Sequence, residues 1–126
     1  MWRRLPLAFA LLLPAGLLSA CSVGDSGGPE VVASFYPLQY VAERIVGDHA
    51  EVTNLTKAGT EPHDLELTPR QTADLASADV VLYEHGLQPS VDEAVDNESP
   101  EHAVDAASVV DLHKADDGNG VDPHFW

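Results

Sequence analysis

Cysteine and positive charge are both scarce in this chain. Its 126 residues include a single cysteine, Cys21, so no disulfide can form within the chain. Lysine and arginine together number 6 against 21 aspartates and glutamates, for a formal net charge of −15. Nucleic-acid binding depends on many positively charged contacts to phosphate. The composition therefore argues against nucleic acid as a partner.

Apolar runs long enough to span a membrane are also lacking. The longest one, residues 5–18, is interrupted only by proline and glycine and falls short of the roughly 20 residues that a membrane-spanning helix needs. It follows Arg3 and Arg4 and ends just before Cys21, which is the layout of an export signal. We therefore expect residues 1–20 to be a cleaved signal peptide rather than a permanent anchor.

Cys21 lies where cleavage of that signal would leave it as the first residue. The sequence LSAC at positions 18–21 resembles a bacterial lipobox, in which the cysteine sulfur receives a diacylglycerol. An ordinary cleavage site followed by a stray thiol is the alternative. Two or more acyl chains hold a protein firmly on a membrane. Residues 21–29 are then a lipidated cysteine and a Gly- and Ser-rich flexible tether, which predicts an extracytoplasmic protein anchored to the cell membrane.

The chain beyond the signal is strongly acidic. Four basic residues remain there against all 21 acidic ones, which gives a formal net charge of −17. Such a charge raises the local concentration of cations, although solubility alone is an equally good explanation.

Short apolar runs alternate with amphipathic segments along the rest of the chain. Residues 30–35 have the composition of a strand buried on both faces of a parallel sheet, residues 50–55 and 79–83 are also predicted strands, and residues 108–112 are a weaker candidate. Proline, which suits the first turn of a helix, opens the segment that follows each of the first three runs. This order predicts an α/β fold, with flanking helices on a parallel sheet and right-handed crossovers.

The expected helices carry specific local patterns. Apolar residues at i, i+3, i+4 and i+7 predict one buried face for the first helix, and Gly47 can end it. That face consists of Leu38, Val41, Ala42 and Ile45. Thr68 and Gln71 form a capping box for the second helix, which we expect to run to about Ser77. The inner face of the third helix consists of Val91, Ala94 and Val95.

Three histidines follow the ends of predicted strands. His63 comes after the second strand, His85 after the third and His124 after the fourth. The carboxyl ends of parallel strands meet at one edge of a sheet, and ligands bind there. Neutral imidazole suits zinc and the neighbouring transition metals. A metal site at this edge is one hypothesis, and a structural role for each histidine is the other.

Three motifs give the chain a resemblance to a known family. They are ASFYPL at 33–38, GTEPHDLELTP at 59–69 and DPHFW at 122–126. In this order, and over nearly all of residues 31–126, they strongly resemble the zinc- and manganese-uptake solute-binding lipoproteins of ABC transporters. Some of those proteins are also called adhesin lipoproteins. The resemblance implies that His63 and His124 are ligands of a divalent metal ion, zinc or manganese, and the acidic segment 111–120 slightly favours zinc.

Other polar residues near these motifs are weaker candidates. Asp64 and Asp122 adjoin the two histidines and could orient their rings by accepting the second ring N–H, or could be solvated loop acids. His85 is not at a usual ligand position of the family. His113 lies in the acidic segment 111–120, which is similar to the histidine-rich loop of zinc-specific members but much poorer in histidine. We treat His85 and His113 as weaker metal candidates.

Members of the family have two α/β lobes joined by a long helix, with the metal between the lobes. The resemblance therefore implies that residues 30–126 are a partial N-terminal lobe, that the chain ends before the joining helix, and that the third and fourth ligands belong to the absent lobe. The expected role is a monomeric, non-enzymatic receptor that passes metal to an ABC permease. One alternative is a metal-dependent hydrolase, against which the lack of an H-E-x-x-H motif counts. The other is a lipid-anchored, adhesin-like surface module without a transport function.

Overall fold

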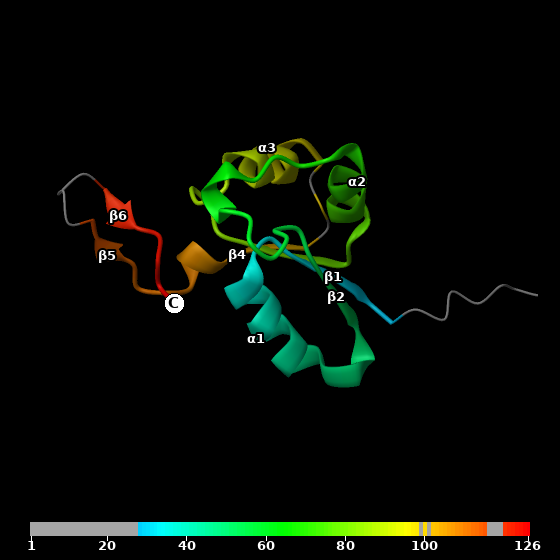
Figure 1. The fold of residues 1–126 in the computed structure, drawn as a ribbon. Helices are drawn as coiled ribbons and strands as arrows, with labels where there is room; N and C mark the ends of the chain where they lie inside the picture. The colour runs from blue at the N-terminus through cyan, green and yellow to red at the C-terminus, as the bar shows by residue number, and fades with distance from the viewer. Residues whose placement is uncertain (1–27, 99, 101, 116–119) are drawn as a thin grey trace, which may run out of the picture.

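The structure is a computed structural model that describes residues 28–98, 100, 102–115 and 120–126. The expected signal peptide, Cys21 and most of the tether lie outside these residues. Within the part of the chain that the structure describes, no helix is long and apolar enough to cross a membrane. The strands form a four-stranded sheet and a separate two-stranded hairpin (Figure 1).

The four-stranded sheet is parallel throughout. Its strands are β1 (Glu30–Ala33), β2 (Glu51–Asn54), β3 (Val80–Tyr83) and β4 (Ala103–Asp105), in the spatial order β2-β1-β3-β4. The register aligns Val32 of β1 with Thr53 on one side and with Val81 on the other. A parallel sheet with flanking helices confirms the predicted fold class.

Helices cover both faces of this sheet (Figure 1). They are α1 (Tyr36–Val46), α2 (Pro69–Ser77) and α3 (Pro89–Glu98). The predicted capping box of α2 is confirmed, because the Gln71 backbone N–H donates to Oγ1 of Thr68 at 3.3 Å and the Thr68 N–H donates to Oε1 of Gln71 at 3.0 Å. Gly47 ends α1 with a positive φ of 55°, a conformation that glycine adopts at little cost.

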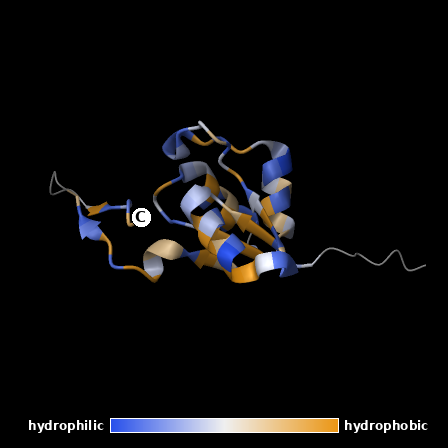
Figure 2. Ribbon diagram, turned by 60° about the horizontal axis from the view of Figure 1, so that its bottom comes forward, coloured by the Kyte–Doolittle hydropathy of each residue, from blue (hydrophilic) through white to orange (hydrophobic). Residues whose placement is uncertain are grey.

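The hydrophobic core has two halves, one on each face of the sheet. Side chains alternate along a strand, so the neighbours Val32 and Ala33 belong to different halves. The half beneath α2 and α3 contains Val32, Leu55, Leu65, Leu75, Ala78, Val81, Val91 and Ala94. The half on the α1 face contains Ala33, Phe35, Leu38, Leu87 and Ala106. Figure 2 shows the hydrophobic strands between the helices.

The predicted inner face of α1 is only half right. Leu38 and Ala42 are buried, but Val41 is 49% exposed and Ile45 is 77% exposed. Because α1 packs over β1 and β2, its second apolar row faces the β3–β4 side of the sheet instead. There Val41 and Ile45 line a groove of about 390 Å³ together with Val104, and no polar side chain contributes to it.

The predicted strand at 108–112 is wrong, because the fourth strand comes earlier. The chain turns immediately after β4, where the Asp105 carboxylate accepts the backbone N–H of Ala107 at 2.9 Å and starts the 3-10 turn η3 (Ala106–Ser108). This Asp cap bends the backbone before residue 108 can pair with β3.

A small hairpin lies between the η3 turn and the last residues of the chain. Strands β5 (His113–Lys114) and β6 (Val121–Asp122) pair antiparallel, away from the main sheet (Figure 1). His124 therefore follows β6 of the hairpin rather than a fourth strand of the main sheet. The last residues nevertheless return to the sheet, where the ring of Trp126 lies 4.8 Å from the ring of Phe35.

Candidate metal centre

His63 lies in a tight turn between β2 and α2. The 3-10 turn η2 (Pro62–Asp64) is closed by the Leu65 backbone N–H, which donates to the Pro62 carbonyl oxygen at 3.2 Å, and buried Leu65 attaches the turn to the core. The His63 ring itself is exposed, with Nδ1 3.2 Å from the carbonyl oxygen of Leu87. Because a carbonyl only accepts, this contact assigns the hydrogen to Nδ1 and leaves Nε2 as an acceptor.

His124 is held by its neighbour Asp122. Oδ1 of Asp122 accepts the backbone N–H of His124 at 3.0 Å and lies 2.7 Å from the ring Nδ1. The backbone bond and then the ring bond lower the pKa of the Asp122 carboxyl, because both donors favour its charged form. Asp122 thus stays a carboxylate that accepts Nδ1–H, and Nε2 of His124 is again left as an acceptor.

The two rings meet at these Nε2 atoms. Nε2 of His63 and Nε2 of His124 are 3.4 Å apart, although the residues are 61 positions apart in the sequence. With both hydrogens on Nδ1, two lone pairs face each other, which is unfavourable unless a proton or a cation lies between them. The rings meet edge to face at an interplanar angle of 64°.

The separation of the two nitrogens fits a shared metal ion. Zinc–imidazole bonds of about 2.0–2.1 Å at a tetrahedral angle place two ligand nitrogens roughly 3.3–3.4 Å apart. The observed 3.4 Å matches this distance. In the described part of the chain, no group of three or more His, Cys, Asp or Glu residues could hold a metal ion. The pair therefore offers two ligands, and their role as ligands stays a prediction.

Aromatic packing brings the His124 segment to the sheet edge. The ring of Trp126 lies 5.2 Å from the His124 ring and 4.8 Å from the ring of Phe35, which is 1% exposed and lies two residues after the end of β1. Phe125 also contacts Trp126, at 5.3 Å. The motifs at 33–38 and 122–126 thus contact each other, because aromatic side chains from both are packed together at the carboxyl end of β1.

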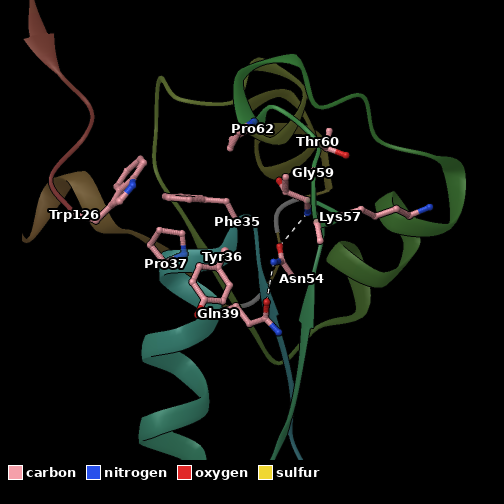
Figure 3. Close-up of a pocket in the computed structure, with 12 residues that line it drawn as sticks. Phe35, Tyr36, Pro37, Gln39, Asn54, Lys57, Gly59, Thr60, Pro62 and Trp126 are labelled. Atoms are coloured by element: carbon pink, nitrogen blue, oxygen red, sulfur yellow. Dashed lines mark hydrogen bonds between the residues drawn. The ribbon is translucent and has the colours of Figure 1, made fainter.

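A pocket of about 410 Å³ lies between the start of α1 and the loop that follows β2 (Figure 3). Trp126 and Phe35 form one side, and Pro62, which precedes His63, lies at its upper rim. On the other side, Nδ2 of Asn54 donates to Oε1 of Gln39 at 2.8 Å. Pro62 and Trp126 connect this pocket to the two histidine segments, although neither His63 nor His124 is among the residues that line it.

Of the weaker candidates Asp122, Asp64 and His113, only Asp122 hydrogen-bonds to the ring of a proposed ligand within the described ranges. Asp122 contacts the ring of its histidine, but among the hydrogen bonds of the described residues Asp64 makes none to His63, whose Nδ1 faces the Leu87 carbonyl instead. His113 pairs with Asp122 across the hairpin.

His85 points to a different partner. Its Nδ1 is 3.4 Å from Oδ1 of Asp92, and its backbone N–H donates to Oδ1 of Asp105 at 3.0 Å. The side chain is 67% exposed. Although His85 follows a strand as expected, it is engaged with the start of α3 and the end of β4 rather than with the two facing imidazoles.

Sequence reasoning missed Glu84, an acid buried at the same sheet edge. It directly follows β3, is 1% exposed, and neither carboxyl oxygen has a hydrogen-bond partner among the described residues. Burial, and next the nearby charge of Asp105, raise its pKa to about 7, while His124 acts in the opposite direction. An acidic residue immediately after an apolar strand was the available signal, because that position faces the carboxyl edge.

These features define an α/β lobe, with candidate metal ligands gathered near the carboxyl ends of parallel strands. Residues 31–126 match the model of the family described as zinc-uptake complex component A, periplasmic (ZnuA), and the chain belongs to this family. The match confirms the resemblance that the three motifs indicate.

Individual relatives agree with this assignment. The chain is 28% identical to the manganese-binding lipoprotein MntA of Halalkalibacterium halodurans, over 98% of this chain and 44% of that protein. It is 31% identical to the high-affinity zinc uptake system protein ZnuA of Bacillus subtilis, over 94% of this chain and 43% of that protein. The chain thus spans less than half the length of either relative.

Solved structures give the same answer for the fold. The Zn(II)-bound ZnuA-like domain of AdcA from Streptococcus pneumoniae superposes with a TM-score of 0.68 at 29% identity. The superposition covers 79% of this chain and 38% of that chain. The shared part corresponds to one lobe of a metal-binding protein.

Proposed function

We propose that this chain captures a divalent transition metal outside the cytoplasm and passes it to the permease of an ABC importer. His63 and His124 supply two ligands through their Nε2 atoms. The observation that carries the proposal is the 3.4 Å separation of these two atoms, while both Nδ1 atoms face acceptors. Membership of the zinc-uptake family supports a metal ion as the cargo.

Zinc is the favoured cargo over manganese. Imidazole suits zinc, whereas manganese prefers carboxylate and water oxygens. Both proposed ligands are imidazoles, and they supply two of the four positions that a closed zinc site fills. We propose that a second lobe, of the kind implied by the resemblance, supplies the others. In this chain alone, water completes the coordination, so zinc binds weakly and exchanges quickly.

The proposed role is binding rather than catalysis. A hydrolytic metal site needs a general base within reach of the metal-bound water. Asp122 is engaged with His124, and the Glu84 carboxyl is buried away from solvent at 1% exposure. Zinc-dependent hydrolysis of a panel of esters and peptides, lost in a His63→Ala variant, would contradict a pure binding role.

We further propose that Cys21 carries the lipid that anchors the chain to the cell membrane as a monomer. The lipobox-like sequence at 18–21 supports this proposal. In cells fed an alkyne-labelled fatty acid, the chain should acquire the label and appear in the membrane fraction. A Cys21→Ser variant should do neither. Equal labelling of the wild type and the Cys21→Ser variant would contradict the proposed lipidation and would leave the proposed metal site unaffected.

Zinc titration of the purified chain by calorimetry tests the metal site. We expect His63→Ala and His124→Ala each to weaken zinc binding by roughly tenfold or more. Even mutation of a residue that only hydrogen-bonds to a metal ligand lowers metal affinity about 10–100-fold. The exposed His49, in the turn after α1, provides a matched control as His49→Ala. Equal affinities for the wild type and the double variant of residues 63 and 124 would remove these residues from the site.

A further inference from the structure

Gln88 is a buried polar residue that the proposed metal binding leaves unexplained. It lies between β3 and α3 and is 1% exposed. Its carbonyl oxygen accepts the backbone N–H groups of Val91 and Asp92, both at 3.0 Å, so its backbone begins α3. Its side chain instead contacts the carboxyl ends of neighbouring strands. A glutamine buried this deeply requires partners for its amide, and here Nε2 has them whereas Oε1 has none among the described residues.

The Gln88 side-chain amide joins three segments of the chain. Nε2 donates to Oγ1 of Thr56 at 2.9 Å and to the carbonyl oxygen of Pro62 at 3.1 Å, and the carbonyl oxygen of Ser34 lies at 3.5 Å. The Thr56 hydroxyl in turn donates to the Ser34 carbonyl at 2.7 Å. Two of these acceptors are carbonyls, which cannot donate, so the orientation of the amide is assigned by its surroundings.

The same short segment holds the His63 turn at two points. The Leu87 carbonyl accepts Nδ1–H of the His63 ring at 3.2 Å, and the next residue, Gln88, donates to the carbonyl of Pro62. Leu87 is itself 1% exposed and packs in the core half on the α1 face. One contact therefore orients the ring, and the other ties the backbone just before it to the ends of β1 and β2.

We propose that Gln88 is a positioning residue of the metal site, which fixes the turn that carries His63 so that its Nε2 meets that of His124. This inference rests on the proposed role of His63 as a ligand. Two imidazoles share an ion only within a narrow range of separations, so a turn free to shift would lose that geometry for much of the time. Gln88 acts on the metal through the backbone of Pro62 and does not touch it.

The test compares two nearly isosteric variants of the same buried network in the full chain. Gln88→Met removes the donor to Pro62. The matched control, Thr56→Val, removes the hydroxyl but leaves the bond between Gln88 and Pro62 in place. We expect Gln88→Met to weaken zinc affinity about tenfold or more, and Thr56→Val to keep the wild-type affinity. The free energy of unfolding of each variant, measured in urea, separates the loss of affinity from a general loss of stability.

A spectroscopic measurement distinguishes positioning from a merely structural role. The visible absorption of bound Co²⁺ reports coordination geometry, and it should change in Gln88→Met but not in Thr56→Val. Wild-type zinc affinity in Gln88→Met, or equal losses in both variants, would overturn the proposal. If His63→Ala also keeps wild-type affinity, the proposed function fails as well. If His63→Ala weakens binding and Gln88→Met does not, only the role of Gln88 is lost.

A measurement on the wild-type chain keeps the proposal testable even if Gln88→Met does not fold. The Gln88 side-chain amide protons should exchange slowly with solvent in NMR spectra, because the amide is buried and its Nε2 donates hydrogen bonds to Thr56 and Pro62. Their resonances should shift when zinc is added, as the Pro62–His63 turn is held more firmly. Exchange at the rate of an exposed glutamine would contradict the network, and resonances unmoved by zinc would contradict its link to the site.

Discussion

Asp122 and His124 are joined twice through a single carboxylate oxygen. Oδ1 of Asp122 accepts both the backbone N–H and the ring Nδ1–H of His124, at 3.0 and 2.7 Å. His63 differs, because its Nδ1 faces the carbonyl oxygen of Leu87 and not the neighbouring Asp64. The two histidines are thus oriented by different chemistry, one by a charged side chain and the other by a neutral backbone group.

This difference predicts unequal effects for the two neighbouring acids. Asp122→Ala removes the acceptor that fixes the tautomer of His124, and we expect it to weaken zinc affinity about 10–100-fold. Asp64→Ala leaves the contact between His63 and Leu87 intact and should keep the affinity within about twofold of the wild type, as expected for an exposed acid. Calorimetric titration of both variants under identical buffer and salt measures this. Equal losses would mean that general negative charge, and not ring orientation, controls binding.

The raised pKa of Glu84 predicts that the stability of the chain falls between about pH 4.5 and 7. Its pKa rises from 4.5 to about 7 in the folded chain, mainly through burial and next through the nearby charge of Asp105, with His124 lowering it and Asp122 raising it further. Between these two values the folded chain holds a proton that the unfolded chain has lost. The contribution of Glu84 to the free energy of unfolding therefore falls as pH rises through this window, and the fall is complete above about 7.

Glu84→Gln should remove that contribution. The free energy of unfolding of the variant, relative to the wild type, should rise from pH 5 to pH 8 in urea titrations. Glu66→Gln, which neutralises an exposed acid in the loop before α2, is the control for the loss of one negative charge. A difference between Glu84→Gln and the wild type that stays constant across this range would show that the Glu84 carboxyl is not perturbed by burial.

Truncation of the two helix residues Leu75 and Ile45 should change the free energy of unfolding by very different amounts. Leu75 of α2 is 0% exposed within the core, and Leu75→Ala should lower the free energy of unfolding by about 2–5 kcal/mol. Ile45 of α1 is 77% exposed, and Ile45→Ala should change it by about 0.5 kcal/mol or less. Thermal and urea unfolding measure both. A large loss for Ile45→Ala would mean that the groove beside α1 is covered in solution.

Local patterns predicted most of the fold because the relevant interactions are local. The capping box of Thr68 and Gln71 and the end of α2 at Ser77 depend on residues a few positions apart. The errors arose where tertiary packing decided the outcome. The row of Val41 and Ile45 has the helical spacing of a buried face, yet α1 packs over β1 and β2 and leaves it exposed.

The site divides in the same way. His63, His124 and Asp122 were predicted because their motifs carry a resemblance to a family that the comparison confirms. Glu84 and Gln88 carry no motif, since their importance arises only from burial at the carboxyl edge of the sheet. The expected link between Asp64 and His63 was replaced by the backbone of a residue 24 positions further on, which no spacing rule indicates.

Periodicity, charge and motifs are properties of neighbouring residues, and they were enough to predict the α/β order of strands and helices, the acidic character of the chain and the two candidate imidazole ligands. The 3.4 Å separation of the two Nε2 atoms and the different acceptors of the two Nδ1 atoms could be known only from the folded chain. Those distances depend on how a parallel sheet gathers its carboxyl ends and on how Trp126 packs against Phe35. Such contacts join residues far apart in the chain, so packing, and not the local preferences of neighbouring residues, sets the geometry of the site.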